Sequence, residues 1–368
     1  MQSDRVSSIS LTVTGPLLEK LSAIERQFSE LEDLVLLSRD SVPQTLPSAF
    51  RWGPRLRRLH STGVAFPALP QLLRSSKDLV DLQLHKVLNP CHFPPEALTN
   101  ALSEMTRLES LSLHFLPTAF YLDPSPPSGG RVVLPALTRL KFRGNTDYSE
   151  GLMNRIDAPH LEDIEVAFSH IVTLRLSKLS EFIDRIELHR SYRRARILSS
   201  ENAVSVSLIQ PGAPTRLTLE LFCKRFSEQL SFVTHVFIRL SAILSNVEDL
   251  HIGAMQPSNW QGDNYRKLWR GVIHRFECAK RFHLAVMDHP TNIVFAVQLS
   301  EAVQPALRKL YIPQPGPRNV PLREALVSLM TSRRLSGHPI AVEYEQLCQI
   351  GVLSDTGKTY ASSCATNC

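Results

Sequence analysis

One short phrase recurs along the chain and limits the folds available to it. The stretch TRLESLSLHFL at residues 106–116 places leucines three and then two residues apart, at Leu108, Leu111 and Leu113. A helix would space them three and four apart throughout, and a strand two apart throughout. We therefore interpret each phrase as a turn closed by the first leucine, followed by a short strand on which the next two leucines point inward.

Copies of this phrase define a repeat. They read LEDLVLL, LVDLQLH, LTRLKFR and LEDIEVA. The copies begin 22–29 residues apart in a first series and 28 or 32 apart in a second, at Leu31, Leu56, Leu79, Leu108, Leu137, Leu161 and Ile183, then Val247, Ala279 and Leu307. The pattern L-x-x-L-x-L with a period of about 20–29 residues is that of a leucine-rich repeat. Between the series, VSVSL from Val204 and LTLEL from Leu217 are predicted to be strands of less regular units.

Amphipathic stretches lie between the copies and predict helices. They are residues 94–105, 230–244 and 265–276, and a further one at 321–335 precedes a predicted strand, PIAVEY. One strand and one helix cannot bury their leucines alone, so stacked units must share a core. The expected fold class is α/β, an irregular leucine-rich-repeat solenoid or horseshoe, with strands on the concave face and helices on the convex face. It is irregular because only Asn145 fills the asparagine-or-cysteine position that follows each strand.

The predicted domain organisation follows the repeats. Residues 1–24 form an N-terminal segment and residues 25–346 the repeat domain, with a flexible tail at 347–368. Within the repeat domain we expect three interruptions or additions, namely a loop insertion at 123–131, a proline-stiffened connection at 313–321 and a C-terminal cap at 322–346.

Composition limits the classes of function. The chain has 368 residues and a formal net charge of +6, which is only mildly basic for this length, so a nucleic-acid partner is not favoured. No secretory leader and no run of eighteen apolar residues occurs, so we expect no membrane partner. The six cysteines follow no disulfide framework, which favours a reducing compartment, the cytoplasm or the nucleus.

Motifs for catalysis or cofactor binding are weak. GVLSDTGKT at 351–359 resembles a phosphate loop, but five residues separate Gly351 from Gly357 where the motif needs four. Cys364 and Cys368 lack a second pair of zinc ligands. We expect no catalytic residue, no cofactor and no metal. The arginine run HRSYRRARI from His189 is either a solvated loop or a patch for phosphate or nuclear import.

The residues beside the strand leucines are the candidate binding surface. Strand side chains alternate, so these residues point away from the core, onto the concave face. The predicted protein-binding residues are Arg58, His60, Asp81, Gln83, His85, Ser112, His114, Arg139, Lys141, Arg143, Asp163 and Glu165. The same alternation adds Thr62, Ser110, Ala167, His251 and His283 to the face. Its mixed charge suits a protein partner better than a polyanion.

Several stretches resemble the repeat region of fungal F-box proteins with irregular leucine-rich repeats. They are LRRLHSTGVAFPALPQLLRSSKDLVDLQLHKVLNP, PPEALTNALSEMTRLESLSLHF, RIDAPHLEDIEV and TSRRLSGHPIAVEYE, and together they span about residues 25–346. The resemblance implies a substrate receptor of a cullin-based ubiquitin ligase, in which an N-terminal F-box docks on the adaptor and the repeats hold the target. Residues 1–30 show no F-box pattern, so the F-box either lies upstream or has been lost, and a cullin-ligase adaptor is expected as a partner only if an F-box lies upstream.

Two functional hypotheses stand beside each other. The first is a non-enzymatic protein-binding module, the substrate-recognition part of an F-box-type receptor or a stand-alone leucine-rich-repeat scaffold. The second is a nucleic-acid-binding solenoid that uses the arginine clusters.

Overall fold

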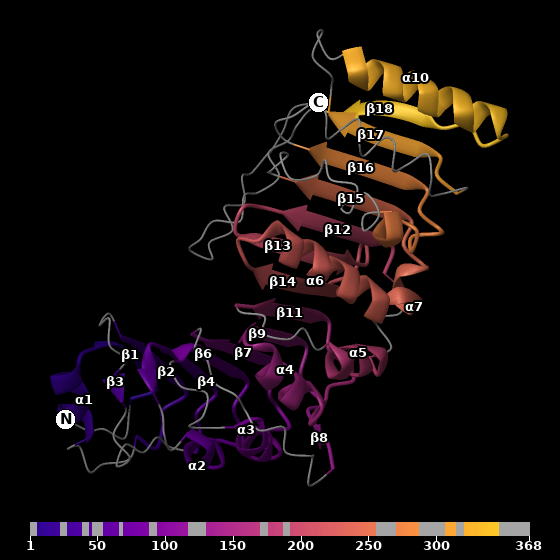
Figure 1. Cartoon of the computed structure of the whole chain (residues 1–368). Coiled ribbons are helices and arrows are strands. Elements are labelled where there is room, and N and C mark those ends of the chain that lie inside the picture. The colour runs from indigo at the N-terminus through magenta and orange to yellow at the C-terminus, as the bar shows by residue number, and fades with distance from the viewer. Residues whose placement is uncertain are drawn as a thin grey trace. The chain divides into compact units, whose positions relative to one another are not determined.

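The chain is an α/β protein with a large, mostly parallel sheet of 14 strands (Figure 1). The computed structural model describes residues 6–22, 28–38, 44–45, 54–65, 69–87, 94–116, 130–169, 176–186, 192–254, 270–286, 306–313 and 320–345. They fall into two compact units, Met1–Val247 and Glu248–Cys368.

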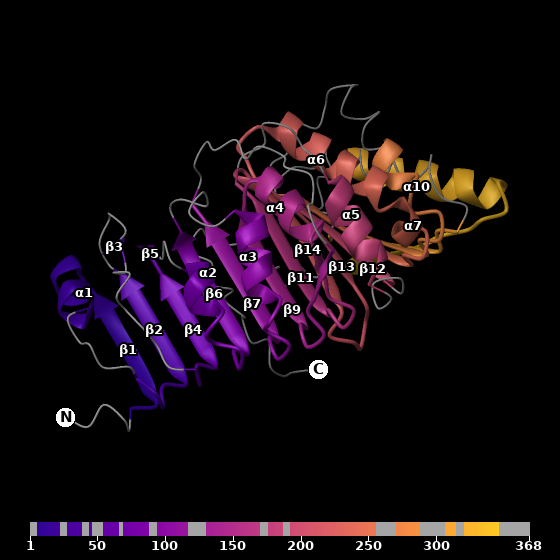
Figure 2. The same ribbon diagram turned by 90° about the horizontal axis from the view of Figure 1, so that it is seen from below.

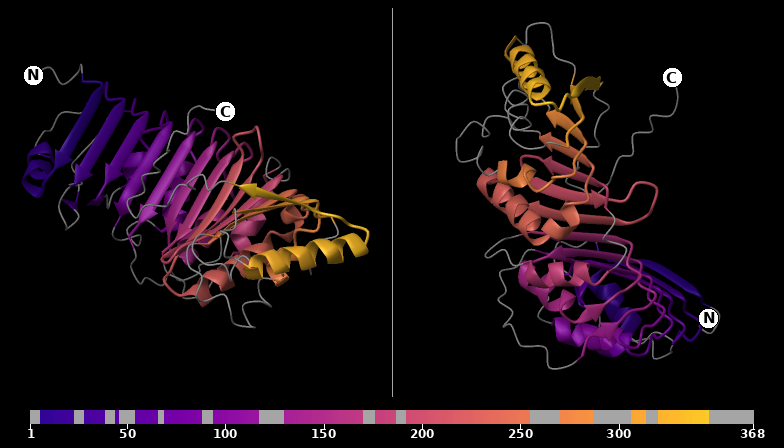
Figure 3. Two further views of the ribbon diagram at one scale, coloured as in Figure 1. Left: turned by 90° about the horizontal axis from the view of Figure 1, so that it is seen from above. Right: turned by 90° about the vertical axis from the view of Figure 1, so that its right-hand side faces the viewer.

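The first unit carries the strands that the repeating phrase predicts and one further strand within the N-terminal segment 1–24. The parallel ones, in spatial order, are β1 (Ser8–Val13), β2 (Asp33–Ser38), β4 (Arg58–Thr62), β6 (Asp81–Val87), β7 (Ser110–Phe115), β9 (Arg139–Gly144) and β11 (Asp163–Phe168). Two small parallel pairs join β3 (Gln44–Thr45) to β5 (Val64–Ala65) and β8 (Val132–Val133) to β10 (Ile156–Asp157). The left panel of Figure 3 shows the strands of this unit side by side.

The first leucine of each phrase closes a turn, as predicted. The N–H of Leu108 donates to the carbonyl of Met105 at 3.2 Å, and Leu137 donates to Leu134 at 3.3 Å. Each of these leucines is fully buried. The copy assigned to Ile183 is wrong by three residues. Ile183 lies in the last turn of a helix and accepts from Ile186 at 3.0 Å, so Ile186 closes that turn. The two isoleucines are three apart, the same spacing as the phrase itself.

Each strand start is hydrogen-bonded to the preceding unit in the same way. The carbonyl of Val80 accepts from Glu109 and Ser110 at 2.9 and 3.1 Å, and the carbonyl of Glu109 accepts from Thr138 and Arg139 at 3.0 and 3.1 Å. This contact keeps neighbouring strands in register, so that the buried positions line up across the sheet. The buried row that results is Leu34, Leu59, Leu82, Leu111, Leu140, Ile164 and Leu217.

The helices of the first unit cover one face of these strands. Figure 2 shows α2 to α5 in front of the strands, and the right panel of Figure 3 shows helices on one side of them. The bounds are α1 (Gly15–Ser22), α2 (Leu69–Leu73), α3 (Pro95–Leu102), α4 (Thr146–Met153), α5 (Ser177–Asp184), α6 (Phe226–Arg239) and α7 (Ser241–Leu244). The single helix predicted at 230–244 is two helices, because Leu240 leaves the helical conformation at φ −100° and ψ 15°.

Asn145, which the sequence placed at the position after a strand, caps a helix. Its side-chain oxygen accepts from the backbone N–H of Tyr148 at 2.8 Å and thereby caps the N-terminus of α4. Tyr148 is 1% exposed and packs with Phe115 and Phe142, with ring centroids 4.5 and 5.9 Å away. The cap therefore fixes the chain where strand β9 turns into a helix over an aromatic cluster.

The parallel order is interrupted by two antiparallel pairings. Strand β14 (Arg216–Phe222) lies parallel to β11, but β13 (Ala203–Ile209) is antiparallel to β14, and β12 (Arg194–Ser199) is antiparallel to β13. The predicted strands VSVSL and LTLEL are present, within a hairpin. The arginine run, interpreted from sequence as a loop, corresponds from Arg194 onward to strand β12.

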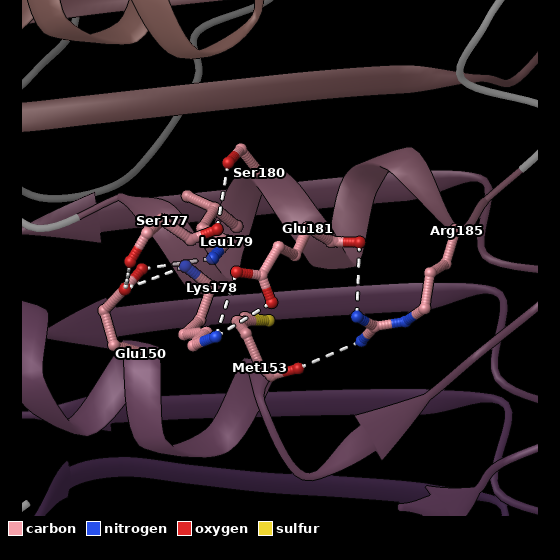
Figure 4. Close-up of polar contacts among 8 residues, drawn as sticks. All are labelled: Glu150, Met153, Ser177, Lys178, Leu179, Ser180, Glu181 and Arg185. Atoms are coloured by element: carbon pink, nitrogen blue, oxygen red, sulfur yellow. Dashed lines mark hydrogen bonds and ion pairs between the residues drawn. The ribbon is translucent and has the colours of Figure 1, made fainter.

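Polar contacts couple α4 to α5 (Figure 4). The carboxylate of Glu150 on α4 accepts from the Ser177 hydroxyl and from the backbone N–H groups of Lys178 and Leu179, at 3.0, 2.9 and 3.1 Å. Arg185, at the other end of α5, donates to the carbonyls of Met153 and Glu181, both at 3.2 Å. These bonds satisfy backbone groups that a helix leaves unpaired at its ends.

The second unit repeats the parallel pattern with four strands, β15 (Asp249–Ala254), β16 (Arg281–Val286), β17 (Lys309–Pro313) and β18 (Ala341–Glu345). Helix α10 (Val320–Leu335) and strand β18 match the predicted helix and strand near the C-terminus. Leu322 and Leu329 on α10 are fully buried, and Arg333 donates to the carbonyl of Leu307 at 2.9 Å. Of the helix predicted at 265–276, residues 270–273 are helical and residues 265–269 lie outside the described ranges.

Other predictions fall beyond the described residues. They concern most of the loop insertion at 123–131, the phosphate-loop-like stretch at 351–359, and the cysteines Cys91, Cys364 and Cys368. Within the described ranges, no helix is long and apolar enough to span a bilayer.

We expect Leu111→Ala to lower the free energy of unfolding by about 2–5 kcal/mol, because Leu111 is 0% exposed in the middle of the buried row. Urea unfolding of the purified chain measures this change. The control is Glu109→Ala, a change at an exposed side chain two residues earlier. It should alter the free energy of unfolding by no more than about 0.5 kcal/mol. Equal losses for the two variants would contradict the burial described here.

We expect Glu150→Ala to destabilise the first unit by about 1–3 kcal/mol, because it removes a charged acceptor shared by three donors at the start of α5. The matched control is Glu181→Ala on α5, which breaks only the exposed pair with Lys178 and should change stability by about 0–1 kcal/mol. If both variants unfold at the same urea concentration, the coupling between α4 and α5 contributes nothing.

Candidate functional site

The strand side chains that alternate with the buried row form one continuous surface of the first unit, here called the polar face. In-register pairing places the twelve predicted residues on five neighbouring strands, β4, β6, β7, β9 and β11. The polar face comprises Asp33, Arg58, His60, Thr62, Asp81, Gln83, His85, Ser110, Ser112, His114, Arg139, Lys141, Arg143, Asp163, Glu165, Ala167, Arg216, Thr218, Glu220 and Phe222. The predicted direction of these side chains is therefore consistent with the strand register.

The row at the strand starts alternates in charge. Arg58 pairs with Asp33 through two contacts, one of them at 2.6 Å, and Arg216 pairs with Asp163 at 3.0 and 3.3 Å. The hydrogen bond from Arg58 lowers the pKa of Asp33, and the bond to Asp163 raises the pKa of Arg216. Arg139 is exposed, and no described residue forms an ion pair with it. Its charge is thus available to a partner.

The next row of the polar face holds further close polar pairs. Its members are His60, Gln83, Ser112, Lys141 and Glu165. His60 Nε2 lies 2.9 Å from a carboxylate oxygen of Asp81, and the Gln83 amide donates to the same oxygen at 3.1 Å. Lys141 Nζ donates to Glu165 at 2.8 Å. The two residues face each other because β9 and β11 pair in register. The basic stripe of Arg139, Lys141 and Arg143 is consequently neutralised in part within the face.

The exposure of three face residues differs from the expectation. Ser110 and Ser112 are each only 9% exposed, because longer neighbours cover them, and the Ser112 hydroxyl lies 2.9 Å from His85 Nε2. Ala167 is 4% exposed for a similar reason. A short side chain on a crowded strand face is covered even when it points away from the core.

The third row contains the most perturbed groups of the face. Burial, and after it the positive charge of Arg143, lowers the pKa of His114 to about 4. Burial also lowers the pKa of His85, whose ring meets the His114 ring edge-on with centroids 6.2 Å apart. Both imidazoles are therefore neutral at physiological pH. Farther along the row, burial and the neighbouring Glu165 raise the pKa of Glu220, while Arg143 lowers it.

Five residues of the polar face escaped the sequence prediction. They belong to the face because β2 and β14 pair with predicted strands, and they are Asp33, Arg216, Thr218, Glu220 and Phe222. The alternation in LTLELF indicates that Glu220 and Phe222 point away from the core, but the sequence pattern does not predict that this strand lies beside β11. It depends on a connection of 47 residues, between Phe168 and Arg216.

A separate cluster lies in the second unit. His251, His283 and Tyr311 occupy matching positions on β15, β16 and β17, and their rings stack with centroids 3.9 and 4.1 Å apart. Arg281 forms an ion pair with Asp249 on the row beside the stack. Lys309, on the same row, forms an ion pair at 2.7 Å with Glu343 on β18. Both histidines were predicted to lie on the outward face, and they form a stacked column there.

The chemistry of the polar face is that of a charge-balanced hydrogen-bonding surface. Its cations are Arg58, Arg139, Lys141, Arg143 and Arg216, and its carboxylates are Asp33, Asp81, Asp163, Glu165 and Glu220. Equal numbers of opposite charges do not create the strong positive potential that a nucleic-acid phosphate backbone requires. Among the described residues, no group of histidine, cysteine and carboxylate side chains is arranged to hold a metal ion.

No family model matches this chain, and no curated protein matches it.

We expect the low pKa of His114 to appear as a loss of stability in acid. The unfolded chain binds a proton at the ordinary pKa of 6.5 and the folded chain only at about 4, so stability is lost as pH falls from 6.5 towards 4. A nuclear magnetic resonance titration of the His114 ring measures the folded value. In the Arg143→Met variant that value should rise, because one cause of the shift is removed. Titration of His114 near 6.5 in the wild type would contradict the buried site.

Proposed function

We propose that the chain is an irregular leucine-rich-repeat solenoid, with its strands on the concave side, and that it is a non-enzymatic protein-binding module. The observation that carries this proposal is the polar face, where residues from at least seven consecutive or paired strands, β2 to β14, form one surface. The recurring turn, strand and helix support the solenoid. Such a surface offers many weak polar contacts, which is how solenoids recognise extended partners.

The charge distribution supports a protein target over a nucleic acid. Ion pairs within the face leave alternating positive and negative positions, which complement a partner of mixed charge. The nucleic-acid alternative predicts binding that weakens steeply with salt. A filter-binding titration with single- and double-stranded DNA and with RNA at low salt tests it, and salt-sensitive retention would favour the alternative.

The resemblance to F-box proteins extends the proposal to the substrate-recognition part of a ubiquitin-ligase receptor in the cytoplasm or nucleus. That role needs an F-box to dock on the adaptor. The test is the genomic sequence upstream of Met1, together with recovery of a cullin-ligase adaptor by the product of the whole gene. An in-frame F-box with adaptor recovery supports the ligase role. If neither an F-box nor an adaptor is found, the chain is a stand-alone binding protein.

We expect the triple change Arg139→Ala, Lys141→Ala and Arg143→Ala to weaken capture of the target from cell extract, mainly by slowing a salt-sensitive association. The melting temperature should change little, because exposed ion pairs such as Lys141 with Glu165 are worth about 0–1 kcal/mol. Quantitative mass spectrometry of the captured proteins, at two salt concentrations, measures the effect.

The matched control removes the same charge elsewhere. Arg74, Lys77 and Arg107 are exposed residues in turns outside the polar face, and their triple change to alanine lowers the net charge equally. Captured proteins that are lost with the first triple variant and retained with the control support the proposal. Equal capture by both variants and the wild type would show that the binding surface lies elsewhere.

A further inference from the structure

Strand β1 (Ser8–Val13) is the outermost strand of the first unit (Figure 2). Within the described part of the chain it pairs with β2 alone, in an uninterrupted parallel register. The other edge of β1, here called the open edge, therefore presents backbone N–H and C=O groups that no described strand meets. An edge of this kind is a template for a strand of another chain.

The register with β2 identifies the backbone groups at the open edge. The N–H of Asp33 donates to the carbonyl of Ser7 at 3.0 Å, so the odd-numbered residues of this stretch direct their backbone groups towards β2. The even-numbered residues direct theirs the other way, and they are Ser8, Ser10 and Thr12. All three are exposed. Each of them offers one donor and one acceptor to a strand that lies alongside.

The open edge lacks the features that commonly prevent such pairing, namely lysine, proline, a bulge or an inward charge. No charged residue and no proline occurs from position 6 to position 15. The pairing of β1 with β2 is continuous over the whole strand, without a bulge. By contrast β18, the strand at the other end of the sheet order, carries Glu343 and Glu345. The open edge of β1 is thus compatible with a further strand.

The core side of β1 is incompletely covered. Ile9 and Leu11 lie opposite Leu34 and Leu36 of β2 and face the same way. Leu34 and Leu36 are 1% and 0% exposed, whereas Ile9 and Leu11 are only half-buried. The difference arises because β2 has a strand on each side and β1 has one described neighbour. A strand paired with the open edge would remove Ile9 and Leu11 from water, which is favourable.

The residue order of β1 fits a second copy of itself. In an antiparallel pair centred on Ser10, the Ser10 residues of the two copies exchange backbone hydrogen bonds, and Ser8 of each copy does so with Thr12 of the other. Ile9 then lies opposite Leu11 of the other copy on the core side, so the half-buried side chains cover each other. Hydroxyl groups meet on the opposite side, and no like charges oppose one another.

We propose that two copies of this chain pair through β1, antiparallel and centred on Ser10, so that their sheets join into one. The two-fold axis is perpendicular to the sheet, which limits the assembly to two copies and places both polar faces on the same side. A target with two binding segments could then engage both copies at once. The pairing follows from β1 itself and does not depend on what the polar face binds.

Sedimentation equilibrium of the whole chain tests the pairing. One strand from each copy is a small interface, so the dimer should dissociate on dilution. Over concentrations from about 1 μM to about 1 mM, the range of weak association, the average mass should rise from 41.4 kDa towards twice that value. Ser10→Lys places two lysines opposite each other at the axis and should weaken association about tenfold or more. Its melting temperature should match the wild type, because Ser10 is exposed.

A mixture of two variants tests the register. Ser10→Glu alone should also stay monomeric, but equimolar Ser10→Lys and Ser10→Glu should associate, because opposite charges then meet at the axis. The control is Ser332→Lys, which adds the same charge at an exposed position of α10 and should dimerise like the wild type. A wild type that stays monomeric throughout, or a Ser10→Lys variant that dimerises equally well, would overturn the pairing through β1. Two monomeric variants that do not associate when mixed would overturn the antiparallel pair centred on Ser10.

Discussion

The in-register row of buried leucines is the constraint on which the rest of the first unit depends. Each strand offers one of these side chains to the interior at the same depth as its neighbours, and each is almost completely buried. The backbone holds the row through a recurring contact, in which the carbonyl before one strand accepts two N–H groups from the start of the next. A slip of one residue would turn every leucine outward, so the row determines the register of the sheet and, with it, the positions of all residues on the opposite face.

The polar face is the direct consequence of that register. Residues that lie 20–30 positions apart in the chain, or 53 apart for Asp163 and Arg216, become neighbours about 4.8 Å apart, and their charges pair along the rows. Most of the pairs are exposed, so they contribute little to stability and more to the pattern that a partner meets. Arg143 departs from the pattern, since its guanidinium lies over the Phe222 ring of β14, 4.1 Å from the ring centroid, and forms no ion pair with a described carboxylate.

The N-termini of the helices are capped by polar contacts that vary from unit to unit. Asn145 caps α4 from the end of a strand, whereas Glu150 caps α5 from the neighbouring helix. The two solutions satisfy the same unpaired N–H groups. This variety fits the uneven spacing of the repeats. The number of residues between successive strands differs, so a different side chain reaches the start of each helix.

Local pattern in the sequence predicted most strands of the large sheet, the helical regions that contain α3, α6, α7 and α10, and the outward set of side chains. Leucine spacing of three and then two distinguishes turn and strand over a few residues, and alternation then assigns each side chain to a face. The sequence also pointed to Asn145. It could not place Ile183 correctly, because Ile183 and Ile186 repeat the spacing of the phrase inside a helix. Only the tertiary structure brought β14 beside β11 through an antiparallel hairpin, and with it Arg216, Glu220 and Phe222. It alone decided which charges pair and which side chains are covered, because these depend on contacts between residues distant in the chain.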